Sequence, residues 1–485
     1  MKLYHLVKDA ENTRIENLKE IEIENVTANI TDVRKGSLFV AVKGLNFDGN
    51  EFVPEALEKG ASAIITERSD IIGSENCPVI CVENSRKALA YAASEFFGRP
   101  SEKLCMIGIT GTNGKTSTAH LIAHVLTENG IRCGILGTVG AKFGDRSENL
   151  SHTTPDSVTL HSILAKMVAE GITHVVMEVS SHALDQDRVF GINFKIGIFT
   201  NLSVDHLDYH KDMKSYAHSK LKLFEMSEIC IANKDSDFSE PFVKYKNGKK
   251  RVFTFSAHGD SDYKAENISV SADGNRFDVV KYNTITAMKV REKLCGFFNV
   301  YNTLAAIAAA DILGLTENEI SAPLSAFLSV KGRMETVETG LGFTVIIDYA
   351  HTPDGLGNVL SSIRLYCKGK ILTVFGCGGD RDRSKRPLMG KVASSLSDFV
   401  VVTSDNPRGE DPENIITDIL VGMKDKANFA VISDRREAIR YALLKAEKND
   451  IVLLAGKGHE TYQIINGEKY HFDEREEIEK FLKNR

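Results

Sequence analysis

Apolar runs of strand length alternate with helix-like stretches through the middle of the chain. Four such runs occur, at residues 104–109, 131–136, 174–179 and 196–200. Between them, apolar residues recur at helical spacing. Strands that alternate with helices in this way predict a parallel sheet covered by helices.

The same alternation occurs on both sides of this middle part. Before it, short strands are predicted at residues 37–42, 63–66 and 79–82. After it, buried-strand runs occur at residues 344–347, 371–375, 399–403 and 451–454. Breaks near residues 97–101 and at Lys331-Gly332-Arg333 separate the parts. The pattern therefore predicts an α/β fold with three domains, at residues 1–100, 101–332 and 333–485.

Residues 240–295 interrupt the regular alternation. Short alternating runs rich in Asp, Asn and Gly replace it, before a helix-like stretch that contains Ala305, Ala306, Ala308 and Ala309. Strand-like runs joined by turn residues are typical of antiparallel hairpins. We therefore predict an antiparallel insertion in the middle domain.

Composition and charge narrow the class of protein. Of the 485 residues 42% are apolar, and the net charge of −6 gives no basic field that would attract nucleic acid. No apolar run is long enough to span a membrane, and the charged N-terminus lacks the core of a signal peptide. The eight cysteines are scattered, which predicts reduced thiols. We expect a cytoplasmic protein with no nucleic-acid partner and no membrane segment.

A glycine-rich loop follows the run at residues 104–109. It reads Thr110-Gly111-Thr112-Asn113-Gly114-Lys115-Thr116-Ser117 and leads into a helix-like stretch. The N–H groups of such a loop bind phosphate at the start of a helix, a lysine adds a cation, and a threonine hydroxyl can hold Mg²⁺. The standard phosphate loop has a glycine where Ile109 stands, and a chance Gly-Lys-Thr in a surface turn is the alternative. The order of strand, glycines, Lys-Thr and helix favours a nucleoside triphosphate site.

Two polar clusters follow later strands of the same domain. Glu178 ends one run in Glu178-Val179-Ser180-Ser181-His182, and residues 201–210 concentrate imidazoles and carboxylates after the next. Carboxylate oxygens suit Mg²⁺. Taken singly, these side chains are better explained as solvated or structural. Their shared position at strand ends, in the domain of the phosphate loop, favours one common site.

Four segments together resemble the Mur ligase family. They are the loop at 110–116, the run Glu178–His182, Asp205-His206-Leu207-Asp208, and Asp348-Tyr349-Ala350-His351-Thr352-Pro353-Asp354. The similarity extends from about Ser37 to Glu460. It implies a UDP-sugar-binding N-terminal domain, a central ATP-binding domain with a phosphate loop, and a Rossmann-like C-terminal domain that binds an amino acid.

The resemblance also implies a reaction. ATP phosphorylates a substrate carboxylate, and an amine then attacks the acyl phosphate to give an amide, ADP and phosphate. The type that this sequence resembles most adds meso-diaminopimelate to UDP-N-acetylmuramoyl-L-Ala-D-Glu, a step of peptidoglycan precursor synthesis in cell-wall biogenesis. A monomer is expected.

The resemblance assigns residues to ATP and to two Mg²⁺ ions. Those implied to bind ATP are Gly111, Thr112, Asn113, Gly114, Lys115, Thr116, Ser117, Asn299, Arg333, Asp348 and His351. Those implied to hold the metal are Thr116, Glu178, His206 and Lys220, the last as a carbamate. The implied catalytic set is Lys115, Glu178, His206 and Lys220. An ammonium at Lys220 would repel Mg²⁺, whereas a carbamate carries a negative charge and two oxygens. A solvent-facing lysine is the alternative for Lys220, and a helix cap is the alternative for Asn299.

The UDP-sugar peptide is implied to lie between the first two domains. The matching positions are Thr153, Thr154, Ser180, Gln186 and Arg188, with Leu45, Asn46 and Phe47 at the uridine end. The family usually has Asp-Ser-Arg where this chain has Asn29-Ile30-Thr31. Thr31 or backbone groups are therefore expected to replace the usual serine contact.

The amino acid is implied to bind at strand ends of the third domain. The matching residues are Arg381, Asp405, Asn406, Pro407, Arg408, Gly456 and Glu460. A second carboxylate, as meso-diaminopimelate carries, suits bidentate binding by Arg408, and its distal ammonium suits Glu460. L-lysine lacks that carboxylate and is the rival substrate. The chain could also be a folylpolyglutamate-synthetase-like ligase, or an ATP-binding regulator without ligase chemistry.

Overall fold

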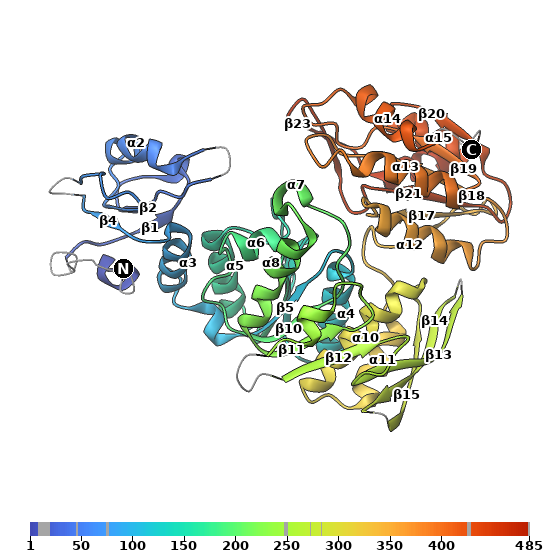
Figure 1. Ribbon diagram of the computed structural model, residues 1–485, viewed down its shortest axis with the longest axis horizontal. Helices are drawn as coiled ribbons and strands as arrows, with labels where there is room; N and C mark the ends of the chain where they lie inside the picture. Colours follow the sequence, from blue (N-terminus) through green and yellow to red (C-terminus); the bar gives the residue numbers. More distant parts are fainter. Residues whose placement is uncertain are drawn as a thin grey trace.

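The described residues form three larger sheets and one two-stranded sheet, and Figure 1 shows the larger sheets in three lobes that follow one another along the molecule. The computed structural model describes residues 1–7, 20–44, 47–73, 77–246, 251–271, 273–282, 284–423 and 428–483. Helices cover each of the three sheets, so the predicted α/β class is confirmed.

The N-terminal sheet has four parallel strands in chain order. They are β1 (Asn25–Thr27), β2 (Ser37–Val40), β3 (Ala63–Thr66) and β4 (Val79–Cys81). The apolar residues of β2 and β3 are buried on both faces, as expected for a parallel sheet between helices. The short helix α1 (Leu3–Leu6) precedes β1, α2 (Val53–Glu58) lies between β2 and β3, and α3 (Ser85–Phe96) follows β4.

The phosphate loop leaves the middle of the central sheet. Strand β5 (Cys105–Thr110) pairs in parallel with β9 (His174–Glu178) on one side and β10 (Phe194–Phe199) on the other. Ile109 lies opposite Glu178, and Thr110 lies opposite Phe199. The parallel part of this sheet also includes β6 (Cys133–Gly137) and β11 (Ser227–Asn233). Because parallel strands end at one edge, the segments after β5, β9 and β10 lie together.

Helices and apolar side chains fix that edge. Helix α4 (Lys115–Glu128) begins directly at the phosphate loop and packs against α10 (Phe297–Ile312). The alanines at 305, 306 and 308–310 of α10 are buried. Small side chains let α10 approach the sheet and α4 closely. The other central helices are α5 (Ser157–Ala169), α6 (Ser181–Asp185), α7 (Leu207–His210), α8 (Met213–Glu225), α9 (Glu240–Val243) and α11 (Glu317–Ala326).

The antiparallel insertion predicted for residues 240–295 was right only in part. Strand β12 (Arg251–Ser256) pairs in parallel with β11, and β13 (Tyr263–Ser271) pairs in parallel with β12. Only β13, β14 (Gly274–Lys281) and β15 (Thr284–Glu292) form an antiparallel meander, and it extends the central sheet. Turn residues mark where strands end but not the direction of the next pairing. At the opposite edge, β7 (Gly140–Phe143) and β8 (Arg146–Glu148) add a hairpin that was not predicted.

The C-terminal sheet has the order β16-β17-β21-β18-β19-β20, and only β16 is antiparallel. Its strands are β16 (Glu335–Glu338), β17 (Thr344–Asp348), β18 (Ile371–Phe375), β19 (Phe399–Val402), β20 (Phe429–Val431) and β21 (Ile451–Ala455). Helices α12 (Pro353–Arg364), α13 (Lys385–Leu396) and α14 (Pro412–Leu420) cover one face, and α15 (Arg435–Lys445) and α16 (Glu474–Lys483) cover the other. A hairpin of β22 (Tyr462–Ile465) and β23 (Glu468–His471) follows β21.

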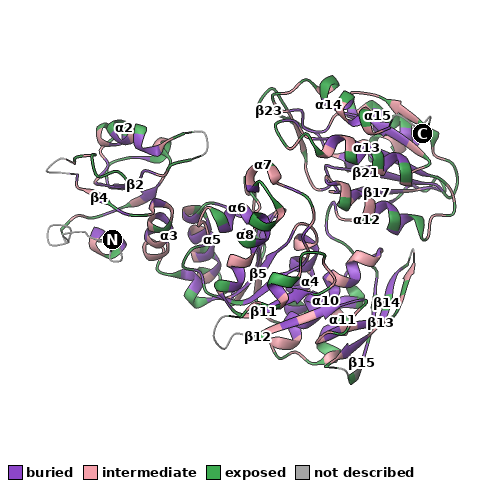
Figure 2. Cartoon of the chain, viewed as in Figure 1, coloured by how far each residue is buried: buried purple, intermediate pink, exposed green. Residues whose placement is uncertain are grey.

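Burial follows the sheets. Figure 2 shows buried residues concentrated along the strands of the central and C-terminal lobes, with exposed residues on the outer faces of the helices. Within the described ranges, no helix combines the length and the apolar content that crossing a membrane requires.

Candidate active site

Strand ends of the central and C-terminal sheets open into one cavity of about 1190 Å³. The predicted site residues that line it are Thr112, Asn113, Gly114, Lys115, Thr116, Ser117, Thr153, Glu178, Ser180, Gln186, Arg188, His206, Asn299, Arg333, Asp348, His351, Arg381, Asp405, Asn406, Arg408, Gly456 and Glu460. Predicted residues that do not line it are Gly111, Thr154, Lys220 and Pro407, together with Thr31 and Phe47 in the N-terminal lobe.

Two glycines allow the tight course of the phosphate loop. Gly111 has φ +150° and Gly114 has φ +85°, in the region that favours glycine. A Cβ at Gly111 would clash with Thr200 Oγ1, and one at Gly114 would clash with Asn302 Oδ1. Ile109 lies fully buried within β5, opposite Glu178. The strand therefore continues through the position where the standard motif has a glycine, and the loop is short.

The Gly114→Ala variant is expected to weaken ATP binding by about tenfold or more, equivalent to about 1.4 kcal/mol. The added methyl group must displace Asn302 or move the loop N–H groups away from the phosphates. Isothermal titration with ATP would measure the loss. Gly130→Ala is the matched control, because Gly130 follows the other end of α4 with φ +77°, and no atom of the described residues outside its immediate neighbours lies within 4 Å of its Cβ position. Equal losses in both variants would contradict the steric explanation.

Side chains of the phosphate loop contact both the loop itself and the C-terminal segment. Within the loop, Lys115 Nζ donates to the carbonyls of Gly111 at 2.9 Å and Thr112 at 2.8 Å. Asn113 Nδ2 donates to Asp354 Oδ2 at 3.0 Å, and Arg333 Nη2 donates to Thr116 Oγ1 at 3.0 Å. Two segments more than 200 residues apart in sequence thus meet at the loop.

Glu178 is buried at the end of β9 and is held by hydroxyl and backbone donors. Its Oε2 accepts from Thr116 Oγ1 at 3.0 Å and from Thr138 Oγ1 at 3.0 Å, and its Oε1 accepts from the Thr138 N–H at 2.9 Å. A Cβ at Gly137 would clash with this carboxylate. Gly137 and Thr138 were not predicted as site residues, although they stand at the end of β6, where the strand-end rule would have found them.

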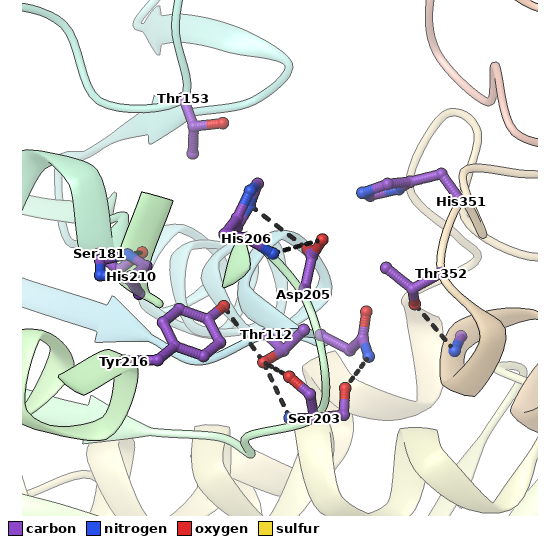
Figure 3. A network of polar contacts seen from close by, with 12 residues as sticks. Thr112, Thr153, Ser181, Ser203, Asp205, His206, His210, Tyr216, His351 and Thr352 are labelled. Carbon is purple, nitrogen blue, oxygen red and sulfur yellow. Dashed lines mark hydrogen bonds and ion pairs between the residues drawn. The ribbon is translucent and has the colours of Figure 1, made fainter. Parts of the chain in front are cut away.

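His206 lies immediately before the short helix α7 and has a left-handed backbone, φ +55°. Its N–H donates to Asp205 Oδ1 at 3.0 Å, and its Nε2 lies 3.3 Å from Asp205 Oδ2. Figure 3 shows His351, on the C-terminal segment, facing Asp205 and His206 across the cavity. Burial and the neighbouring His182 lower the pKa of His206, which favours the neutral ring that a metal requires.

Lys220 lies behind the phosphate loop on α8, where its side chain is buried. Its Nζ donates to the Gly111 carbonyl at 2.8 Å and lies 4.5 Å from the centre of the Tyr216 ring. Burial and the nearby Lys115 hold the pKa of Lys220 well below its ordinary value. The alternative of a solvent-facing lysine is therefore wrong.

The donors at this end of the cavity suit Mg²⁺ bound together with a nucleotide. Among the described residues, no three His, Cys, Asp or Glu side chains converge on one point. Thr116 and Glu178 nevertheless place two hard oxygen donors 3.0 Å apart at the phosphate loop. Mg²⁺ typically takes one or two protein ligands and completes its shell with phosphate oxygens and water, so this donor set fits the ion.

The residues predicted for the sugar peptide form one hydrogen-bonded group beside Glu178. Arg188 donates to Gln186 Oε1 at 2.7 Å and to the Thr154 carbonyl at 2.9 Å. Thr154 Oγ1 donates to the Glu178 carbonyl at 2.9 Å and accepts from the Ser180 N–H at 3.0 Å. Thr153 Oγ1 lies 3.1 Å from Thr138 Oγ1. Thr154 thus orders the segment from behind, while Thr153 and Arg188 line the cavity.

The residues predicted for the uridine end lie in the N-terminal lobe. Thr31 lines a separate hollow of about 420 Å³ with Arg34, and Val158 of α5 closes it from the central lobe. Phe47 is 71% exposed. Leu45 and Asn46 lie outside the described residues.

Three loops of the C-terminal sheet, after β18, β19 and β21, bring the predicted amino-acid residues together. A Cβ at Gly378 would lie 2.7 Å from Arg408 Nη1 and 3.9 Å from Arg381 Cγ, so both arginines flank this glycine. Arg408 Nη1 donates to the Gly379 carbonyl at 2.8 Å, and Asn406 Nδ2 donates to Glu460 Oε2 at 2.8 Å. Burial and Arg408 lower the pKa of Arg381, as expected for two neighbouring cations.

Two predicted ATP residues make internal contacts. Asn299 Nδ2 donates to the Cys295 carbonyl at 2.8 Å, and Asn299 Oδ1 accepts from Asn302 Nδ2 at 2.9 Å. The carboxylate of Asp348 accepts from the N–H groups of Met334 and Ala350, both at 2.7 Å. Both residues line the cavity, but these contacts order the protein around it.

Family models match most of the chain. Residues 22–97 match the Mur ligase family catalytic domain, residues 109–310 match the Mur ligase middle domain, and residues 332–458 match the Mur ligase glutamate ligase domain.

Named relatives and solved structures cover nearly the whole chain. The UDP-N-acetylmuramoyl-L-alanyl-D-glutamate–2,6-diaminopimelate ligases of Clostridium tetani and Caldanaerobacter subterraneus subsp. tengcongensis are 43% and 44% identical, each over 99% of both chains. A solved structure with the same enzyme name is 31% identical, with a TM-score of 0.70 over 100% of this chain and 99% of its own. MurF ligase from Thermotoga maritima, solved with ADP, shares the fold at 21% identity, with a TM-score of 0.63 over 96% of this chain and 100% of its own. The chain belongs to the Mur ligase family.

Proposed function

We propose that this chain is an ATP-dependent ligase that joins meso-diaminopimelate to the D-glutamyl carboxylate of UDP-N-acetylmuramoyl-L-Ala-D-Glu. The observation that supports it most is the single cavity in which the phosphate loop faces Arg381, Arg408 and Glu460. Relatives named for this reaction, similar over nearly their full length, support the same assignment.

ATP binds with its phosphates on the loop N–H groups and the start of α4. Lys115 exchanges its two carbonyl contacts for the γ-phosphate. Thr116, Glu178, His206 and the Lys220 carbamate would hold two Mg²⁺ ions. When bound, these ions neutralise charge between the γ-phosphate and the approaching carboxylate. The C-terminal segment covers the loop through Arg333 and Asp354, which protects the acyl phosphate from water.

The amine comes from the C-terminal side. Arg408 and Arg381 bind the distal carboxylate of meso-diaminopimelate, and Glu460 binds its distal ammonium. The other amino group then attacks the acyl carbon and displaces phosphate. L-lysine leaves the two arginines without an anion, so we propose meso-diaminopimelate as the preferred substrate.

Product formation with UDP-N-acetylmuramoyl-L-Ala-D-Glu and ATP tests the proposal. Chromatography should show ATP-dependent tripeptide product with meso-diaminopimelate and much less with L-lysine. Equal use of both amino acids would remove the assigned role of the arginines, and the absence of any amide product would refute the function. Folylpolyglutamate synthase from Mycobacterium tuberculosis shares the fold at 18% identity over 76% of this chain, and a folylpolyglutamate assay excludes or establishes that activity.

The remaining assignments belong to the same proposal. We place the domain boundaries at 100/101 and 332/333, the uridine moiety at the hollow beside Thr31, and the enzyme in the cytoplasm as a monomer. Crystallisation with the UDP-sugar dipeptide and sedimentation analysis would test the uridine site and the oligomeric state.

A further inference from the structure

The amino-acid site contains a buried cation to which the proposed function gives no role. Lys457 follows β21, and its side chain is 0% exposed. Its Nζ donates to Asn406 Oδ1 at 3.0 Å and to Glu460 Oε2 at 3.1 Å. A buried ammonium is costly unless it is paired and hydrogen-bonded, so these contacts fix the position of Lys457.

Lys457 orients Glu460 both directly and through Asn406. Asn406 Oδ1 accepts from Lys457 and from the Ile464 N–H at 2.9 Å, which turns its amide so that Nδ2 donates to Glu460 Oε2 at 2.8 Å. Two donors therefore converge on Oε2. Within the described part of the chain, no residue hydrogen-bonds to the other oxygen, Oε1. Because Glu460 lines the cavity, Oε1 is the oxygen left for a ligand.

The ammonium of Lys457 also lies close to two carboxylates, Asp405 and Glu460. Asp405 is buried beside Gly456, and a Cβ added at Gly456 would lie 2.8 Å from Asp405 Oδ2. Glu460 lies in the same loop as Gly456. Two neighbouring carboxylates disfavour each other's ionisation. Burial and the charge of Asp405 raise the pKa of Glu460, and the ammonium of Lys457 opposes this shift. Lys457 thus favours the charged carboxylate that Glu460 needs in order to bind a cation.

We propose that Lys457 is a specificity-determining positioning residue, which keeps Glu460 ionised and oriented for the distal ammonium of a diamino dicarboxylic acid. The inference rests on the proposed function and adds the residue that makes Glu460 selective. The selectivity concerns the distal amino group. It therefore separates 2,6-diaminopimelate from L-2-aminopimelate, which keeps the distal carboxylate and lacks the amine.

The test is the ratio of kcat/KM for meso-diaminopimelate to kcat/KM for L-2-aminopimelate. Lys457→Met is expected to lower this ratio by about tenfold or more, the effect of one hydrogen bond to a charged group. Lys457→Gln keeps a hydrogen-bond donor without the charge, so it is expected to lower this ratio less. If Lys457→Met does not fold, the ratio of Lys457→Gln tests the inference alone. Glu460→Gln is expected to give the lowest ratio. The double variant Lys457→Met with Glu460→Gln should have the same ratio as Glu460→Gln alone. Lys469→Met is the matched control, because Lys469 is exposed on the adjacent hairpin, 4.6 Å from the Tyr462 ring.

A merely structural lysine would lower kcat/KM for both substrates equally and leave the ratio unchanged, and that result in both Lys457 variants would overturn the inference. A ratio that rises would overturn it too, because Lys457 would then repel the substrate ammonium. If the unmodified enzyme forms no amide with either amino acid, the proposed function fails. If the unmodified enzyme forms amides and the Lys457 variants have the same ratio as the unmodified enzyme, the proposed function stands and the inference about Lys457 fails.

Discussion

Replacing Lys220 with alanine is expected to lower kcat by about 10³-fold or more. The variant removes the side chain that, in the proposed function, would hold Mg²⁺ as a carbamate. Lys220 is buried behind the loop and donates to Gly111 at 2.8 Å. Its lowered pKa favours the neutral amine, which adds to CO₂ to give a carbamate and a proton. In the proposed function this carbamate would supply oxygens to Mg²⁺, whereas alanine would supply none.

Steady-state kinetics and spectroscopy separate this role from a folding defect. ¹³C NMR with labelled bicarbonate should show a carbamate signal in the unmodified chain and none in Lys220→Ala, and added bicarbonate should not restore activity. Lys222→Ala is the control, since Lys222 lies on the same helix and pairs with Asp185 at the protein surface at 3.2 Å. Full ligase activity in Lys220→Ala, with the thermal midpoint unchanged, would show that the assignment is wrong.

The local elements that carry the candidate site could be predicted where they depend on the order of residues along the chain. The phosphate loop is a strand, a turn and a helix start within about a dozen residues, and it was located from the sequence with its departure at Ile109. Strand ends such as Glu178 and Asp405 could be predicted because parallel strands finish at a common edge.

Contacts between distant segments could not be predicted. Thr138 holds Glu178 across 40 residues, and Arg333 reaches Thr116 across 217. Strand β12 pairs in parallel with β11 and β13. Turn residues mark where a strand ends, but they do not encode the direction of its pairing. Arg435 and Glu474 form a fully buried ion pair at 2.7 Å, and Arg435 also donates to the carbonyls of Ser404 and Ala455, just before Asp405 and Gly456. Neither residue belongs to a motif, so only the structure reveals that α15 and α16 support the segments that carry the proposed amino-acid site.

The Arg408→Ala variant is expected to lower kcat/KM for meso-diaminopimelate by about 100-fold or more, the effect of losing a bidentate pair to a carboxylate. Arg408 lines the cavity beside Arg381, and its Nη1 is anchored on the Gly379 carbonyl at 2.8 Å. The KM for ATP should stay nearly unchanged, because within the described ranges the side-chain hydrogen bonds of Arg408 go to the Gly379 and Asn406 carbonyls and not to the phosphate loop. L-lysine has no distal carboxylate, so its poor use should change little, and the preference between the two amino acids should collapse.

Two further variants distinguish recognition from a change in backbone. Arg408 has φ +53°, a strained conformation for alanine and lysine alike, so Arg408→Lys shares any backbone cost while keeping a positive charge. We expect Arg408→Lys to fall between the unmodified enzyme and Arg408→Ala, because an ammonium cannot reproduce the planar fork. Arg383→Ala is the control in the neighbouring loop, where Arg383 is exposed and Glu410 keeps its contact with Arg386 at 2.8 Å. If Arg408→Ala affected L-lysine and meso-diaminopimelate equally, Arg408 would support the loop and not read the substrate. Loss confined to meso-diaminopimelate would show that a single guanidinium decides which amino acid the ligase joins.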